Sequence, residues 1–141
     1  MRKPELIYSS DFLDERGSLR FFPEFDMQEV LRFYEIKPAT TDIFRAWQGH
    51  KVEKKWFYCL SGSFVIYLIK LDNFEAPSTH LVPERFILSA DLPYLMELPA
   101  GYVTGIKSTV EGSRLLVFSN FSLNQSKMDD FRYPVDQWDI K

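Results

Sequence analysis

The residues best suited to acid–base chemistry lie in one stretch, residues 45–55, at the start of a long apolar run. This stretch holds His50 between two cations, Arg45 and Lys55. An imidazole titrates near neutral pH, so His50 is the candidate general base. Arg45 and Lys55 are candidates to stabilise an oxyanion or to hold a phosphate. The alternative is that the stretch forms only the mouth of a barrel, because a lone histidine is more often structural.

Further candidates come from elsewhere in the chain. Tyr34 and Tyr102 are candidate proton donors in catalysis, although aromatic residues more often serve packing. Trp47 is expected to fill the core or to form a wall of the pocket. His80 is expected in a surface loop, and Cys59 is expected to be a buried small hydrophobe rather than a nucleophile.

The composition indicates one folded domain. The 141 residues are 45% hydrophobic and 16% aromatic, which is enough for a sizeable core. The net charge of −3, without a basic run interleaved with aromatics, argues against nucleic-acid binding. The single cysteine excludes an intrachain disulfide and fits a reducing compartment. We find no signal-like segment and no apolar stretch of about 20 residues, so we expect a cytoplasmic protein that does not bind a membrane.

Short runs rich in β-branched and aromatic residues predict a series of strands. They cover residues 6–9, 18–22, 32–36, 43–48, 55–60, 63–71, 85–88, 94–98, 102–107 and 114–121. Ser61 and Gly62 predict the turn of a hairpin between two of these strands. Helical signals are limited to single turns at residues 26–31 and 126–131, the second with Ser126 as its N-cap. Many short strands separated by turns indicate an all-β sandwich or barrel, a fold that holds ligands in its mouth.

Two sequence motifs resemble those of the cupin superfamily. The metal-binding form of the first motif is H-x-H, then Glu, then six residues and Gly; Gln48, His50, Lys55 and Gly62 stand at these positions. The second motif, P-x-G-x-x-H, is similar to residues 99–104, Pro-Ala-Gly-Tyr-Val-Thr. The resemblance extends from residue 14 to the C-terminal tail and implies a cupin jelly-roll with one or two short C-terminal helical turns.

The residues at the metal-ligand positions imply a metal-free cupin. Glutamine replaces the first histidine at Gln48, a cation replaces the glutamate at Lys55, and Thr104 replaces the last histidine. Only His50 remains of the four ligands, and a divalent metal needs several neutral or anionic donors. We therefore expect no metal and no cofactor.

Metal-free cupins with these motifs resemble RmlC-like enzymes of nucleotide-sugar metabolism. The D-x-R-G element of the dTDP-4-dehydrorhamnose 3,5-epimerases is matched by residues 14–17. The R-G-x-H-A-H-K and C-V-S-G-S elements of the WxcM-like or FdtA-like dTDP-sugar 3,4-ketoisomerases are similar to residues 45–51 and 59–63. The resemblance implies that Arg16 contacts the nucleotide, across a dimer interface. It also implies that Gln48 faces the cavity as a hydrogen-bonding residue, where the epimerases carry their basic histidine.

The resemblance implies an enzyme that epimerises or isomerises a dTDP-4-keto-6-deoxyhexose in deoxysugar biosynthesis for surface polysaccharide. Such an enzyme would be a homodimer whose partner molecule is a small nucleotide sugar. Because glutamine cannot take up a proton at neutral pH, Gln48 argues against the epimerase base. Two alternatives stay open: a non-catalytic cupin that binds a sugar nucleotide, and a structural cupin without a small ligand.

Overall fold

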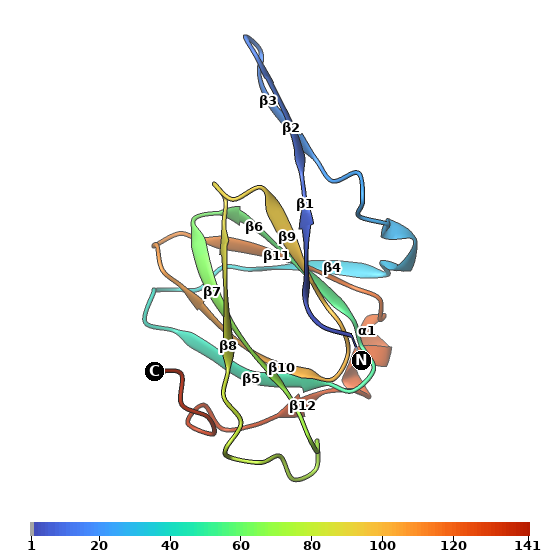
Figure 1. The fold of residues 1–141 in the computed structure, drawn as a ribbon, viewed down its shortest axis with the longest axis vertical. Coiled ribbons are helices and arrows are strands. Elements are labelled where there is room, and N and C mark those ends of the chain that lie inside the picture. Colours follow the sequence, from blue (N-terminus) through green and yellow to red (C-terminus); the bar gives the residue numbers. More distant parts are fainter. Residues whose placement is uncertain (1) are drawn as a thin grey trace.

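Two five-stranded antiparallel sheets face each other in the computed structural model, which describes residues 2–141 (Figure 1). The first sheet has the order β1 (Glu5–Tyr8), β9 (Tyr94–Leu98), β6 (Lys55–Ser61), β11 (Arg114–Ser119) and β4 (Arg32–Ile36). The second has the order β12 (Phe131–Arg132), β5 (Phe44–His50), β10 (Tyr102–Ser108), β7 (Ser63–Lys70) and β8 (Glu84–Ser89). The predicted all-β sandwich is confirmed.

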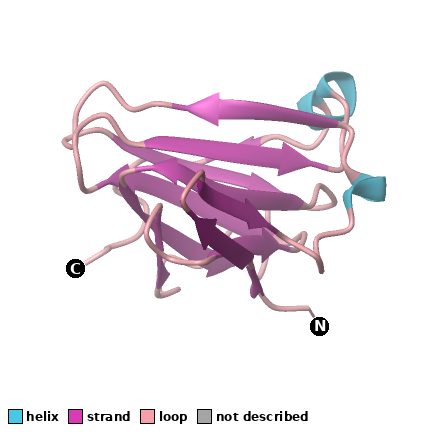
Figure 2. Cartoon of the chain, turned by 90° about the horizontal axis from the view of Figure 1, so that it is seen from above, coloured by secondary structure: helices cyan, strands magenta, loops and turns pink. Residues whose placement is uncertain are grey.

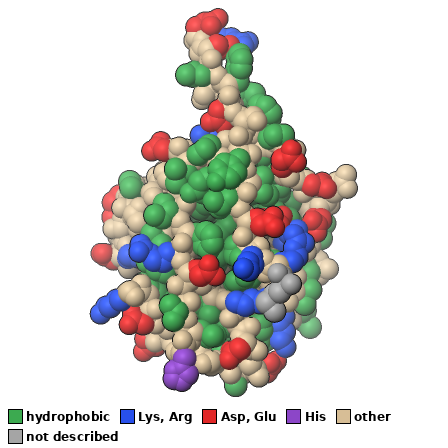
Figure 3. All heavy atoms as spheres, in the orientation of Figure 1, with side chains coloured by type: hydrophobic (Ala, Val, Ile, Leu, Met, Phe, Trp, Pro, Cys, Tyr) green, Lys and Arg blue, Asp and Glu red, His purple; other side chains and the backbone are tan. Residues whose placement is uncertain are grey.

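A separate hairpin, β2 (Ser10–Asp14) and β3 (Gly17–Phe21), projects away from the sandwich (Figure 1). Strand β2 was not predicted, because residues 10–14 contain no β-branched residue. The hairpin exposes apolar side chains, including Phe12, Leu19 and Leu13, which is 79% exposed. Figure 3 shows hydrophobic side chains along this projection and the adjoining surface.

The predicted hairpin at Ser61 and Gly62 is wrong. Strand β6 pairs with β9 and β11, whereas β7 pairs with β8 and β10, so the turn carries the chain from one sheet to the other. Gly62 has φ +74°, and a Cβ atom there would lie 2.0 Å from Ser113 Oγ. Only glycine fits this close crossing without strain.

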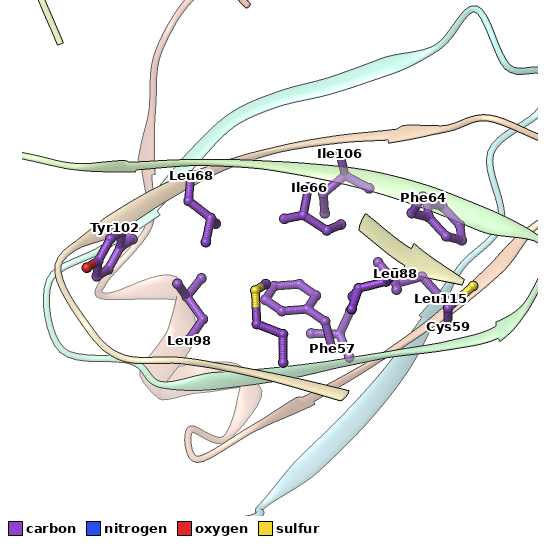
Figure 4. Close-up of a cluster of buried hydrophobic side chains, with 12 residues drawn as sticks. Phe57, Cys59, Phe64, Ile66, Leu68, Leu88, Leu98, Tyr102, Ile106 and Leu115 are labelled. Atoms are coloured by element: carbon purple, nitrogen blue, oxygen red, sulfur yellow. The ribbon is translucent and has the colours of Figure 1, made fainter. Parts of the chain in front are cut away.

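The apolar core lies between the two sheets (Figure 4). Alternate side chains of β7, among them Ile66 and Leu68, point into it and meet Leu98 of β9 and Phe57 and Cys59 of β6. The intervening residues of β7 belong to a second apolar cluster. Both faces of β7 are therefore buried, which explains its long apolar run.

The C-terminal tail covers the outer face of the second sheet. Trp47 and Trp138 make an edge-to-face contact there, with ring centroids 5.4 Å apart. The indole nitrogen of Trp47 donates to the carbonyl oxygen of Val135 at 3.1 Å, and that of Trp138 donates to the carbonyl oxygen of Ser78 at 2.8 Å. The tail is a packing element that also carries the chain back past β5.

Helical structure is short, and both segments lie at one edge of the strand layers (Figure 2). The 3₁₀ turn η1 (Met27–Glu29) falls within predicted residues 26–31. The N-cap of the C-terminal helix α1 (Leu123–Lys127) lies four residues earlier than predicted, because Ser122 takes this position and forms a capping box with Gln125. Ser126 is instead a buried residue inside the helix. Among residues 2–141, no helix is long and apolar enough to cross a membrane.

Candidate active site

A cavity of about 390 Å³ lies between the sheets, beside β4 and β5. Strands β4 and β6 of one sheet and β5 and β10 of the other contribute to its walls, and the tail after α1 closes one side. The polar and charged residues that line it are Tyr34, Arg45, Gln48, Lys55, Thr104 and Arg132, together with Tyr133. Four of the seven, Tyr34, Arg45, Gln48 and Lys55, were candidates from the sequence.

Lys55 supplies a buried cation to the cavity. Its side chain stands at the start of β6, the residue is 5% exposed, and Nζ donates to Tyr34 Oη at 3.0 Å. No carboxylate within residues 2–141 forms an ion pair with it. Burying an uncompensated charge is costly, so the arrangement favours an anionic or strongly polarised ligand in the cavity.

Gln48 lies on the cavity wall, opposite Thr104 in the β5–β10 register. Its Nε2 atom donates to Asp130 Oδ1 at 3.0 Å, and Arg132 Nε donates to the same oxygen at 2.9 Å. Burial acts to raise the pKa of Asp130, but the hydrogen bonds from Arg132 and Gln48 outweigh it and hold the pKa below its usual value. The amide of Gln48 is thus held by a carboxylate that the sequence did not indicate.

His50 is buried beside the cavity rather than exposed on its wall. It lies two residues after Gln48 on β5 and pairs with Tyr102 without an intervening bulge, so both β5 side chains point toward the interior. His50 is 5% exposed, and its Nδ1 atom lies 2.7 Å from the carbonyl oxygen of Asp129. Its Nε2 atom is buried and has no hydrogen-bond partner among residues 2–141.

The surroundings of His50 favour the neutral imidazole. Burial lowers its pKa below 6.5, and the nearby charge of Lys55 lowers it further. The carboxylate of Glu53 and the carbonyl and carboxylate of Asp129 act in the opposite direction, but they do not outweigh burial. Because Nδ1 faces a carbonyl oxygen, the neutral ring carries its proton on Nδ1 and its lone pair on Nε2.

Two sequence-predicted residues lie away from the cavity. Tyr102 packs in the apolar core, its hydroxyl reaches the carbonyl oxygen of Arg2 at 3.5 Å, and burial raises its pKa. Arg16 is exposed at the tip of the β2–β3 hairpin, where its side chain forms an ion pair with Asp14. Within one chain, neither residue can contact a ligand in the cavity.

Trp47 lines the cavity and also packs in the second apolar cluster, with Trp138 of the tail. Both expectations for it, core packing and a wall of the pocket, are therefore met. Arg45 is exposed at the cavity mouth. His80 is exposed in a loop, and Cys59 is buried, as predicted.

The donor set at the motif positions does not fit a divalent metal. Gln48 is held by Asp130, and the ammonium group of Lys55 stands where a carboxylate ligand would be needed. Residues 2–141 contain no group of three or more His, Cys, Asp or Glu side chains arranged to hold a metal ion.

Neither a protein-family model nor a curated protein matches the sequence. Solved structures with the same fold include the sugar 3,4-ketoisomerase QdtA of Thermoanaerobacterium thermosaccharolyticum in complex with TDP. It is 23% identical, covers 95% of this chain and 90% of its own, and has a TM-score of 0.71. The WlaRB TDP-quinovose 3,4-ketoisomerase of Campylobacter jejuni is 20% identical over 97% of this chain and 98% of its own, with a TM-score of 0.72.

A third similar structure is the dTDP-4-dehydrorhamnose 3,5-epimerase of Bacillus anthracis with TDP and PPi bound. It is 16% identical over 98% of this chain and 86% of its own, with a TM-score of 0.73. The chain therefore shares the fold of these ketoisomerases and epimerases, and the expected jelly-roll β-sandwich is confirmed.

Proposed function

We propose that this protein is a cofactor-free isomerase of a dTDP-linked 4-keto-6-deoxyhexose, and that its reaction is 3,4-ketoisomerisation. The observation that carries the proposal is His50 Nε2, a buried acceptor that has no partner within residues 2–141 and lies on the interior face of the strand that also lines a cationic cavity. The similar QdtA structures include one in complex with TDP-4-keto-6-deoxyglucose, which supports this substrate class.

In this reaction the C3 proton of the sugar is removed, an enediolate forms, and a proton returns to C4 while the hydroxyl proton moves from O3 to O4. Substrate and product are isomers, so no oxidant or reductant is needed. His50 Nε2 would accept the C3 proton, since its lone pair is free and burial with the charge of Lys55 keeps the ring neutral at pH 7.

Lys55 and Tyr34 would stabilise the enediolate oxygen. The ammonium and the phenol are joined by a 3.0 Å hydrogen bond at the cavity wall, so they are oriented before substrate binds. A preorganised donor in a site with little water is worth about 10²- to 10³-fold in rate.

Arg45 and Arg132 at the cavity rim would bind the diphosphate. Arg16 lies outside the cavity of its own chain, so a nucleotide contact for it requires a second chain. We propose a cytoplasmic homodimer in which the apolar β2–β3 hairpin, with Phe12, Leu13 and Leu19 exposed, packs against the partner. Light scattering should give twice the chain mass.

Gln48 is the reason for preferring ketoisomerisation to epimerisation. An epimerase base at this position would need a side chain that takes up a proton, and the amide cannot do so. It instead donates to Asp130. The same residue supports the second candidate function, binding of a sugar nucleotide without turnover.

The test is proton NMR in D₂O with dTDP-4-keto-6-deoxyglucose and the purified protein. We expect the carbonyl to move to C3, and we expect deuterium at C4 of the product, the carbon to which the proton returns. Deuterium at both C3 and C5 without carbonyl transfer would indicate epimerase chemistry instead. A sugar that binds but stays unlabelled would favour the binding protein.

Two histidine variants make this assay specific. His50→Asn should lose turnover by at least about 10²-fold while it still binds TDP. His80→Asn changes the only other histidine, which lies in an exposed loop, and should keep full activity. Full activity in His50→Asn would show that another group is the base.

A further inference from the structure

Glu53 is a buried carboxylate whose position the proposed reaction does not yet explain. It lies three residues after His50 in the loop between β5 and β6, and its side chain is fully buried. A buried carboxylate is costly unless several donors compensate it. Its contacts therefore indicate what it serves.

Both oxygens of Glu53 are held by donors from other elements. Oε1 accepts from Ser126 Oγ of α1 at 2.7 Å and lies 3.4 Å from His50 Nδ1. Oε2 accepts from Ser119 Oγ of β11 at 2.5 Å and lies 3.5 Å from Arg32 Nη1. The carboxylate is thus locked in one orientation, with one oxygen directed at the imidazole.

Asp129 holds the loop that carries Glu53. Its carboxylate accepts from the backbone N–H groups of Lys51, Val52 and Glu53 at 2.8–2.9 Å. Its carbonyl oxygen lies 2.7 Å from His50 Nδ1. His50 Nδ1 therefore faces two acceptors and no donor, while Nε2 on the other side of the ring has no partner among residues 2–141.

We propose that Glu53 is a positioning residue for His50: its carboxylate, with the Asp129 carbonyl, keeps the ring proton on Nδ1, leaves the Nε2 lone pair free on the other side of the ring, and stabilises the imidazolium formed on proton uptake. The inference rests on the proposed function in so far as it treats His50 as the base. Glu53 acts only through His50, since its side chain is fully buried and its two oxygens face His50, Arg32 and two serine hydroxyls.

The charges around His50 explain why such a residue is needed. Lys55 faces the ring from β6, and its charge opposes protonation. The charge of a protonated His50 also acts on Asp130, whose pKa it helps to lower. Arg32 lies behind Glu53. Of these groups, Glu53 is the carboxylate that lies within ion-pair distance of the ring.

The first test is the tautomer of His50, read from ¹⁵N NMR of histidine-labelled full-length protein. The chain has two histidines, so His80→Asn leaves a single imidazole to observe. We expect a neutral ring with its proton on Nδ1. A proton on Nε2 would overturn the proposal, and this measurement needs neither a substrate nor a change at Glu53.

The second test is the NMR titration of His50 in Glu53→Gln. Loss of the negative charge should lower the pKa of His50 by about one unit, because a carboxylate at this distance favours the charged form. The acid limb of kcat/KM should move down by the same amount, and kcat should fall while KM stays near its wild-type value. A merely structural role would not move the titration.

Two further variants complete the comparison. Glu75→Gln makes the same chemical change at an exposed carboxylate that pairs with Lys51, and it should leave the pKa of His50 unchanged. Glu53→Asp keeps the charge but moves it away from Nδ1, so the pKa of His50 should fall less than in Glu53→Gln. If Glu53→Gln does not fold, an unchanged pKa in Glu53→Asp would equally overturn the proposal.

The outcomes separate this inference from the proposed function. An Nδ1–H ring whose pKa responds to Glu53, in a protein that turns over no dTDP-keto-sugar, would retain the positioning role and reject the enzyme. Turnover that depends on His50 but not on Glu53, with an unmoved titration, would retain the enzyme and reject the positioning role.

Discussion

The space between the two sheets has two unlike parts. Beneath β7, β8 and β9 it is filled by side chains such as Leu68, Leu88 and Met96, each 0% exposed. Beside β4 and β5 it stays open and carries Gln48 and Lys55. Strand β6 contributes to both parts. Its residues Lys55 and Phe57 both line the cavity, and Phe57 also packs in the apolar cluster.

The two parts contribute to the stability of the fold with opposite signs. The closely packed part stabilises the folded state through apolar burial, and its side chains are not needed to bind a ligand. The open part holds a buried ammonium whose hydrogen-bond partner is Tyr34, and beside it lies an imidazole nitrogen with no partner among residues 2–141; both groups cost free energy in the free protein. Substitutions in the two parts should therefore change different measured quantities.

The largest effect on stability is expected in the apolar part. Leu68→Ala removes a fully buried side chain and leaves a cavity, so the free energy of unfolding should fall by about 2–5 kcal/mol. Urea unfolding measures this change. Activity per folded molecule should stay close to that of the wild type. A loss of activity without a loss of stability would contradict the assignment of the apolar part to stability alone.

Lys55→Met should show the opposite pattern. It removes the uncompensated ammonium but keeps an apolar stem, so stability should be unchanged or higher. The kcat should fall by about 10²-fold, since an oxyanion donor is lost. Unfolding curves and steady-state kinetics on the same sample test this, and a stability loss as large as that of Leu68→Ala would contradict it.

The pH dependence of stability should have a component from His50. Burial lowers its folded pKa below the ordinary 6.5, so the unfolded chain binds a proton first as the pH falls. This contribution is complete above about pH 6.5 and is lost below it, by at most about 1.4 kcal/mol per pH unit. A histidine with a raised pKa would instead stabilise the folded protein at low pH and lose this contribution as the pH rises.

Urea unfolding of the wild type and His50→Asn at about pH 7.5 and about pH 5.5 isolates this contribution. The variant should lose less stability than the wild type between the two pH values. An equal loss in both proteins would show that the folded pKa of His50 is not lowered.

The smallest effect concerns Cys59 in the apolar part. Burial raises the pKa of its thiol to about 11, and the residue is 1% exposed. A thiol reagent should therefore react only after unfolding in denaturant. Rapid reaction of the folded protein would show that the apolar part opens readily.

Much of the strand pattern could be predicted locally. Strands β4 and β9 have the predicted bounds, because each is a short run dominated by large apolar side chains within a few residues of sequence. The turn at Gly62 could not be assigned, since the same residues can close a hairpin or carry the chain to the opposite sheet. Partner strands from far along the chain settle that choice.

Some residues of the candidate site could likewise be predicted from the sequence, and others could not. Arg45, Gln48 and Lys55 were predicted and do line the cavity. Asp129 and Glu53 were not, because each acquires its role from residues distant in sequence. Glu53, for example, meets Ser126 of the C-terminal segment 73 positions away.

Residue type and spacing alone thus established the β architecture, the cupin resemblance and the chemically able stretch around His50. Those features depend on interactions within a strand or on motif spacing. The unexposed position of His50, its free Nε2 and the carboxylate beside Nδ1 depend on the tail folding back across the end of β5. Desolvation and charge act through space, so these properties arise only when distant segments pack together.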